Sequence, residues 1–146
     1  MKVLVTGATG FLGRIVVSSL ISRNISVAVL TRNSPVAVRD SPNTLEYSAH
    51  NPAYIEFDLL GGGNYRDLLH RIQPTHLVHI AWYTDVNKYW ESPLNERWLE
   101  ESVALIRAFC ELGGKHVTVA GSCAEYGSPK SICIEDITPV APHSVY

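Results

Sequence analysis

Three glycines recur every third residue near the amino terminus, in the segment Gly7-Ala8-Thr9-Gly10-Phe11-Leu12-Gly13. In a strand–loop–helix unit, the first glycine permits a tight turn, the second brings backbone close to a phosphate, and the third lets the helix pack closely against the sheet. The free amides and the positive end of the helix then attract an anion. This spacing predicts a site for the pyrophosphate of NAD or NADP. Its predicted cofactor-binding residues are Gly7, Thr9, Gly10, Phe11, Leu12 and Gly13.

The end of the second expected strand bears on the choice between the two dinucleotides. Residues 26–30 are followed by Thr31 and Arg32, with no acidic residue. An acid at this place binds the ribose 2′-hydroxyl of NAD, whereas an arginine accommodates the 2′-phosphate of NADP. Arg32 therefore favours NADP. If Arg32 is simply a solvent-exposed side chain, NAD remains the alternative.

The elements that position this loop alternate along the chain. Short apolar runs predict strands, and apolar residues with helical spacing predict helices between them. The runs lack in–out alternation, which is typical of strands buried on both faces of a parallel sheet. The sequence thus predicts an α/β fold, a Rossmann-like parallel sheet with helices on both faces. Strands are expected over 2–6, 26–30, 53–57, 75–81 and 116–120, helices over 11–23, 65–72 and 93–112, and loops over 33–51 and 122–146.

Composition excludes several other classes of protein. The 146 residues suffice for one domain with a core, and a net charge of −2 offers no electrostatic footprint for nucleic acid or an anionic membrane. The apolar runs are far shorter than the roughly 20 residues of a membrane span, so we expect a cytoplasmic protein with no membrane partner. No metal site is expected. Cys110, Cys123 and Cys133 lack C-x-x-C spacing, and His76 and His79 fall on opposite faces of a strand.

Further segments follow the glycine loop in a consistent order. They are Phe57-Asp58-Leu59, His79-Ile80-Ala81, residues 121–127 (Gly-Ser-Cys-Ala-Glu-Tyr-Gly) and residues 138–146, which end at Tyr146. Together with the loop they resemble the extended short-chain dehydrogenase/reductase family, the NAD(P)-dependent epimerases and dehydratases of nucleotide sugars. The resemblance implies that the cofactor also contacts Asp58, Leu59, Ile80 and Ala81.

The same resemblance implies two catalytic residues. Ser122 matches the catalytic serine of the family, and Tyr146 matches the tyrosine of its Y-x-x-x-K motif. Hydride transfer at a sugar carbon needs an acid or base for the sugar hydroxyl, and a tyrosine with an unperturbed pKa of about 10 is a poor base at neutral pH. A neighbouring lysine lowers that pKa, but the sequence stops before its position. The alternative for Ser122 is a strand-end hydroxyl bonded to local backbone, and a chain-terminal tyrosine is expected to be mobile.

Departures from the family pattern narrow the expected function. The family's Asn-x-x-Gly-Thr is absent, with Asn95 only a candidate for its asparagine, and Cys123-Ala124 replaces the Asp-Glu of dehydratases. Epimerase or ketoreductase chemistry on a nucleotide sugar remains, and the alternative is a non-catalytic NAD(P)-binding sensor or regulatory module. Residues 1–146 are expected to be an incomplete NAD(P)-binding Rossmann domain without the substrate domain. We expect weak cofactor binding and no turnover, and a homodimer is compatible with a full-length form.

Overall fold

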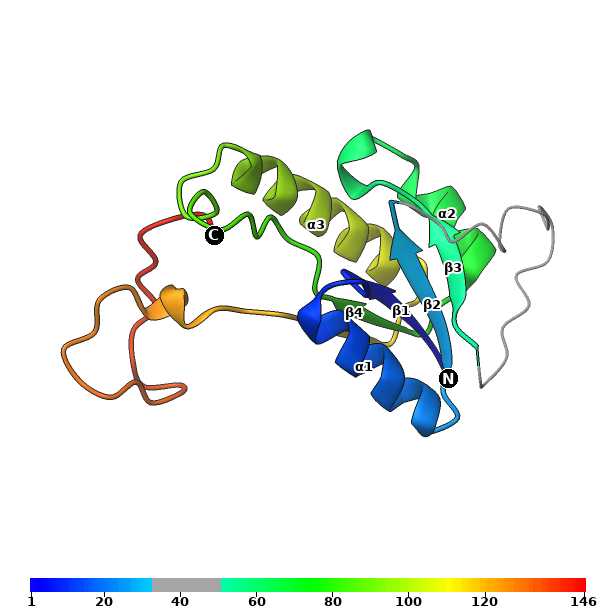
Figure 1. Cartoon of the computed structure of the whole chain (residues 1–146), viewed down its shortest axis with the longest axis horizontal. Helices are drawn as coiled ribbons and strands as arrows, with labels where there is room; N and C mark the ends of the chain where they lie inside the picture. Colours follow the sequence, from blue (N-terminus) through cyan, green and yellow to red (C-terminus); the bar gives the residue numbers. More distant parts are fainter. Residues whose placement is uncertain (33–50) are drawn as a thin grey trace.

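The computed structural model describes residues 1–32 and 51–146, so most of the loop expected over 33–51 lies outside the described residues. Five strands form one parallel sheet in the order β3–β2–β1–β4–β5 (Figure 1). The strands are β1 (Lys2–Thr6), β2 (Ser26–Thr31), β3 (Ala53–Glu56), β4 (His76–His79) and β5 (His116–Val119). The helices are α1 (Phe11–Ser22), α2 (Tyr65–Ile72) and α3 (Leu94–Glu111). These bounds confirm the expected strands and helices to within about two residues.

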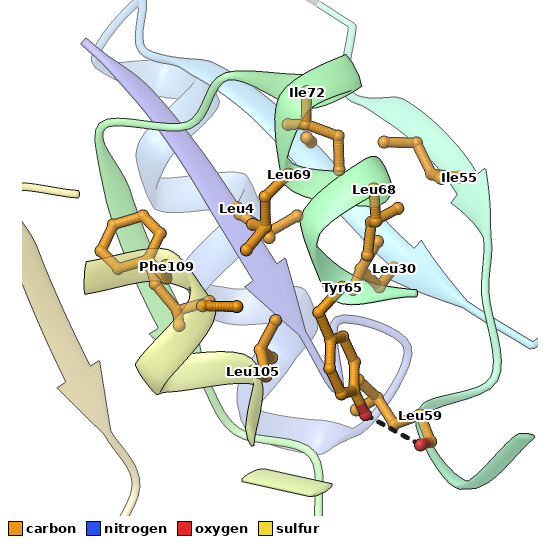
Figure 2. Packing of buried hydrophobic residues seen from close by; sticks show 13 residues of the cluster. Leu4, Leu30, Ile55, Leu59, Tyr65, Leu68, Leu69, Ile72, Leu105 and Phe109 are labelled. Atoms are coloured by element: carbon orange, nitrogen blue, oxygen red, sulfur yellow. Dashed lines mark hydrogen bonds between the residues drawn. The ribbon is translucent and has the colours of Figure 1, made fainter. Parts of the chain in front are cut away.

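The helices cover both faces of the sheet, as the sequence predicts. Helix α1 lies on one face, and α2 and α3 lie on the other (Figure 1). Alternate residues of β1 supply the two cores, because successive strand side chains point to opposite faces. Val3 and Val5 pack on the α1 side, and Leu4 packs beneath α2 and α3. Figure 2 shows Leu4 between Leu69 of α2 and Phe109 of α3.

Strand β5 departs from the expectation that every strand is buried on both faces. It is an edge strand that pairs with β4, and Val119 keeps 53% of its surface exposed. Helix α1 packs over β1 and β2, and β4 lies between these strands and β5 in the sheet order. The local apolar residues therefore predict that β5 is a strand. They do not predict whether a helix covers it, because that depends on elements far away in the sequence.

Two short 3-10 helices, η2 (Leu59–Gly61) and η3 (Cys123–Tyr126), have no counterpart among the expected elements. Each begins after a side chain that accepts a backbone N–H: Asp58 accepts from Leu60, and Ser122 accepts from Ala124. A single capped turn carries no apolar periodicity, so the pattern that predicts longer helices cannot detect it. In the part of the chain that the structure describes, no helix has the length and apolar character needed to cross a membrane.

Candidate functional site

A cleft of about 1070 Å³ lies at the carboxyl ends of the strands. The chain passes outward from β1 to β2 and β3, then returns to β4 on the other side of β1. In open parallel sheets, ligands bind where the strand order reverses in this way. Every residue that the sequence predicts for cofactor binding or catalysis lines the cleft: Gly7, Thr9, Gly10, Phe11, Leu12, Gly13, Arg32, Asp58, Leu59, Ile80, Ala81, Ser122 and Tyr146.

The glycine loop joins β1 to α1 through close backbone contacts. Gly7 has a φ of +69°, and a Cβ there would lie 2.7 Å from the Ala81 nitrogen. A Cβ on Gly13 would lie 2.1 Å from the Gly7 oxygen and 2.5 Å from the Ala8 Cα. Gly10 donates its N–H to the Gly7 oxygen at 3.1 Å. The third glycine therefore lets the helix approach the backbone of its own loop.

The first turn of α1 offers backbone donors to the cleft. Gly10 precedes the helix and has no side chain to cap it. The first amides of an α-helix have no partner within the helix, and the helix dipole makes this end positive. Phe11 is 82% exposed beside these amides. The arrangement can bind an anionic group such as a pyrophosphate against backbone N–H groups.

A second wall of the cleft follows β3. Asp58 caps η2, Leu59 is its first residue, and the Tyr65 hydroxyl of α2 bonds to the Leu59 carbonyl oxygen at 2.9 Å (Figure 2). The same hydroxyl lies 2.6 Å from Glu101 Oε2, so its single proton is shared between two acceptors. Burial and the Glu101 carboxylate raise the pKa of Tyr65 above its ordinary value, so the hydroxyl keeps its proton and remains a donor.

The end of β4 is held by side-chain contacts of His79 that sequence reasoning did not predict. The buried Thr6 hydroxyl lies 2.8 Å from Nδ1 of His79, and His79 Nε2 lies 2.8 Å from Ser102 Oγ of α3. Burial lowers the pKa of His79 from 6.5 to about 4, so the ring is neutral at neutral pH. The threonine directly before the first glycine is a local signal. The serine lies 23 residues beyond the histidine, and the sequence offers no signal for their contact.

Ser122 and Tyr146 lie on the segment that follows β5. Ser122 Oγ accepts the Ala124 N–H at 3.2 Å, which is the local backbone bond of the alternative interpretation, yet the residue also lines the cleft. Tyr146 was expected to be mobile. Its ring instead packs against Tyr89 and Trp90, with centroid distances of 4.6 and 5.2 Å. The contact partners precede α3, so the sequence near Tyr146 could not reveal them.

Two tryptophans complete the cleft wall. Trp82 donates its indole N–H to Asn95 Oδ1 at 3.1 Å, and its ring lies 6.3 Å from that of Trp98. Asn95 is 2% exposed and also donates to the Tyr89 carbonyl at 2.6 Å. Trp82 thus packs on the long helix and lines the cleft at once, while Asn95 holds the loop between β4 and α3. Among residues 1–32 and 51–146, no three or more His, Cys, Asp or Glu side chains lie together so that they could hold a metal ion.

Comparisons with known proteins agree with this geometry. The model of the NAD dependent epimerase/dehydratase family matches residues 3–146. UDP-glucose 4-epimerase 4 of Oryza sativa subsp. japonica is 29% identical over 150 residues, covering 99% of this chain and 40% of the rice protein. dTDP-6-deoxy-L-talose 4-dehydrogenase (NAD(+)) of Aggregatibacter actinomycetemcomitans is 28% identical over 127 residues, covering 87% of this chain and 43% of that protein.

A solved structure gives the same result. The Thermus thermophilus UDP-glucose 4-epimerase in complex with NAD is 28% identical, with a TM-score of 0.74, over 100% of this chain and 46% of that chain. This chain spans about two fifths of the length of the curated relatives it matches. The family model covers nearly all of the sequence, and the glycine loop, sheet order and cleft fit it. The chain therefore belongs to the NAD dependent epimerase/dehydratase family.

Proposed function

We propose that this chain is the N-terminal, cofactor-binding part of an NAD(P)-dependent epimerase or ketoreductase that acts on a nucleotide sugar. The observation that carries the proposal is the shared cleft, in which Ser122 and Tyr146 line the same cavity as the glycine loop. A cofactor-binding module without chemistry needs neither side chain there. The relatives named UDP-glucose 4-epimerase and dTDP-6-deoxy-L-talose 4-dehydrogenase support the substrate class.

Each part of the cleft has a role in this proposal. The loop from Gly7 to Gly13 and the first amides of α1 hold the pyrophosphate. Asp58 and Leu59 hold the adenosine end, and Ile80 and Ala81 lie along the dinucleotide. When bound, the nicotinamide supplies hydride transfer to and from the sugar carbon.

The two catalytic side chains handle the proton of the sugar hydroxyl. The Ser122 hydroxyl orients the reacting sugar oxygen by a hydrogen bond, and the Tyr146 hydroxyl gives or takes the proton. The packing of the Tyr146 ring on Tyr89 and Trp90 holds the phenol at the cleft. The aromatic rings of Trp82 and Trp98 line another part of the cleft.

The preferred dinucleotide forms a finer part of the proposal. Arg32 at the end of β2 lines the cleft and favours NADP, whereas the Thermus relative is described with NAD. Calorimetric titration with NAD⁺ and NADP⁺ decides between them. Arg32→Ala should lower the affinity for NADP⁺ by about tenfold, the loss of one charged contact to the 2′-phosphate, and leave NAD⁺ binding unchanged. An equal effect on both dinucleotides would remove Arg32 from the argument.

The experiment that tests the function separates binding from chemistry. The 146-residue chain should bind a dinucleotide and show little or no turnover of UDP-glucose or a keto sugar nucleotide. In a longer form that turns over, Ser122→Ala and Tyr146→Phe should each slow the reaction about 100-fold or more and leave dinucleotide affinity unchanged. Normal rates in both variants would show that neither side chain is catalytic, and a longer form that binds the dinucleotide without turnover would favour the non-catalytic module instead. A cytoplasmic location and a homodimer of a longer form stay predictions.

A further inference from the structure

A buried chain of hydrogen bonds joins the carboxyl ends of β1 and β4 to the middle of α3. Thr6 and His79 are 2.8 Å apart, and His79 and Ser102 are 2.8 Å apart, each measured between the bonding atoms. The Thr6 hydroxyl also accepts the backbone N–H groups of Ile80 and Ala81, both at 3.2 Å. Thr6 has no exposed surface and His79 has 2%. Because water is excluded, each polar atom depends on these partners.

Counting donors and acceptors assigns the proton on the ring. The Thr6 hydroxyl oxygen accepts the Ala81 N–H and shares the Ile80 N–H with the Thr6 carbonyl oxygen, which lies 3.3 Å from the Ile80 nitrogen. Both backbone groups are donors, so among the bonded neighbours of this hydroxyl in the described residues the His79 ring nitrogen is the acceptor. Its own O–H is therefore the donor to His79, so Nδ1 is an unprotonated acceptor. Nε2 then carries the ring proton and donates to Ser102 Oγ. A proton on Nδ1 would remove that acceptor and leave the buried Thr6 O–H without a partner.

This network sits directly beneath the contact between the glycine loop and β4. Gly7 follows Thr6, and it approaches Ala81 so closely that a Cβ on Gly7 would lie 2.7 Å from the Ala81 nitrogen. The same Ala81 N–H is held by the Thr6 hydroxyl. The Thr6 hydroxyl therefore lies at the contact between the two sides of the cleft.

We infer that His79 is a positioning residue of the dinucleotide site: its neutral ring, protonated at Nε2, orients the Thr6 hydroxyl and so fixes the Gly7 turn against Ala81. The inference rests on the proposed function, because the cleft that it shapes is the proposed cofactor site. The burial that lowers the pKa of His79 favours the neutral ring that the geometry requires. Glu101, the acid beside Ser102 in the sequence, bonds to Tyr65 instead.

Two near-isosteric variants separate the halves of the network. His79→Asn places an amide oxygen where Nδ1 accepts the Thr6 hydroxyl, and it loses the bond to Ser102. His79→Gln places an amide nitrogen near the Nε2 position, and it loses the acceptor for Thr6. NAD⁺ titration of the whole chain should give an affinity for the asparagine variant within about threefold of wild type, and a loss of about tenfold or more for the glutamine variant. His76→Asn, on the same strand but outside the cleft, is the matched control and should leave affinity unchanged.

Two readouts do not depend on the cofactor. Nitrogen-15 NMR of the imidazole ring in the wild-type chain near neutral pH should show an unprotonated Nδ1 and a protonated Nε2 for His79. Hydrogen exchange of the Ala81 amide should remain slow in the asparagine variant and become about tenfold faster in the glutamine variant. A proton on Nδ1, or equal losses in the two variants, would overturn the inference. Failure of every form to bind NAD⁺ or NADP⁺, with the NMR and exchange results as expected, would instead count against the proposed function alone.

Discussion

Replacement of Gly13 by alanine should weaken dinucleotide binding far more than it lowers the stability of the fold. The new Cβ would lie 2.1 Å from the Gly7 oxygen and 2.5 Å from the Ala8 Cα, both backbone atoms. Non-bonded atoms need a separation of roughly 3.5 Å, so the loop and the start of α1 must move apart by more than about 1 Å. Neither atom belongs to a side chain that could rotate away, so the backbone itself has to shift.

The expected magnitudes follow from that displacement. Alanine in place of glycine favours a helix by up to about 1 kcal/mol, whereas overpacking of this kind costs about 1–3 kcal/mol. The net loss in the free energy of unfolding should therefore be small, about 1–2 kcal/mol. Dinucleotide binding is more sensitive, because a misplacement of about 1 Å can cost about 100-fold. We expect the Kd for NAD⁺ or NADP⁺ to rise by that factor.

The assay pairs urea unfolding with calorimetric titration of the dinucleotide. Gly114→Ala is the matched control, because its Cβ would lie 2.1 Å from Phe109 Cε1, an overlap of the same size away from the cleft. The control should lose stability and retain dinucleotide affinity. Gly10→Ala, whose Cβ would meet one atom at 3.3 Å, should have an intermediate effect on affinity. Wild-type affinity in the Gly13 variant would refute the role assigned to this glycine.

Two further predictions concern buried polar groups. Burial lowers the pKa of His79 from 6.5 to about 4, so as the pH falls the unfolded chain takes up the proton first. The contribution of the neutral ring to the free energy of unfolding should be complete above pH 6.5. It should fall by about 3 kcal/mol as the pH drops to 4. Urea unfolding at several pH values measures this, and a slope unchanged by His79→Asn would contradict it. Tyr65→Phe removes the hydroxyl that bonds to Glu101 and the Leu59 carbonyl, and should lower the free energy of unfolding by about 1–2 kcal/mol. Urea unfolding measures this, with Tyr54→Phe as the control. Equal losses in the two variants would show that the Tyr65 hydroxyl bonds do not stabilise the fold.

Local patterns account for the parts of the fold that the sequence predicted well. The apolar run of β1 and the helical spacing of α1 and α3 depend on residues within a few positions of one another. Apolar residues at this short-range spacing are the ones that the element buries, so the predicted bounds of these helices and strands agree closely with the structure. Residues 33–50 are outside the described part of the chain, so the loop expected there is untested. The preference of Arg32 for NADP also stays a prediction.

The candidate site likewise has parts that local sequence predicted and parts that depend on long-range contacts. The glycine spacing by itself predicted that a strand, a turn and a helix would meet, because those contacts lie within seven consecutive residues. The binding of an anion by the amides of this turn stays a prediction. Only the tertiary structure decided that Gly7 closely approaches Ala81 and that His79 bonds to Thr6, 73 residues away. It also decided that the Tyr146 ring packs on Tyr89 and that β5 stays exposed at the edge. Such pairings depend on the order of strands in the sheet, which long-range packing sets and no local pattern records.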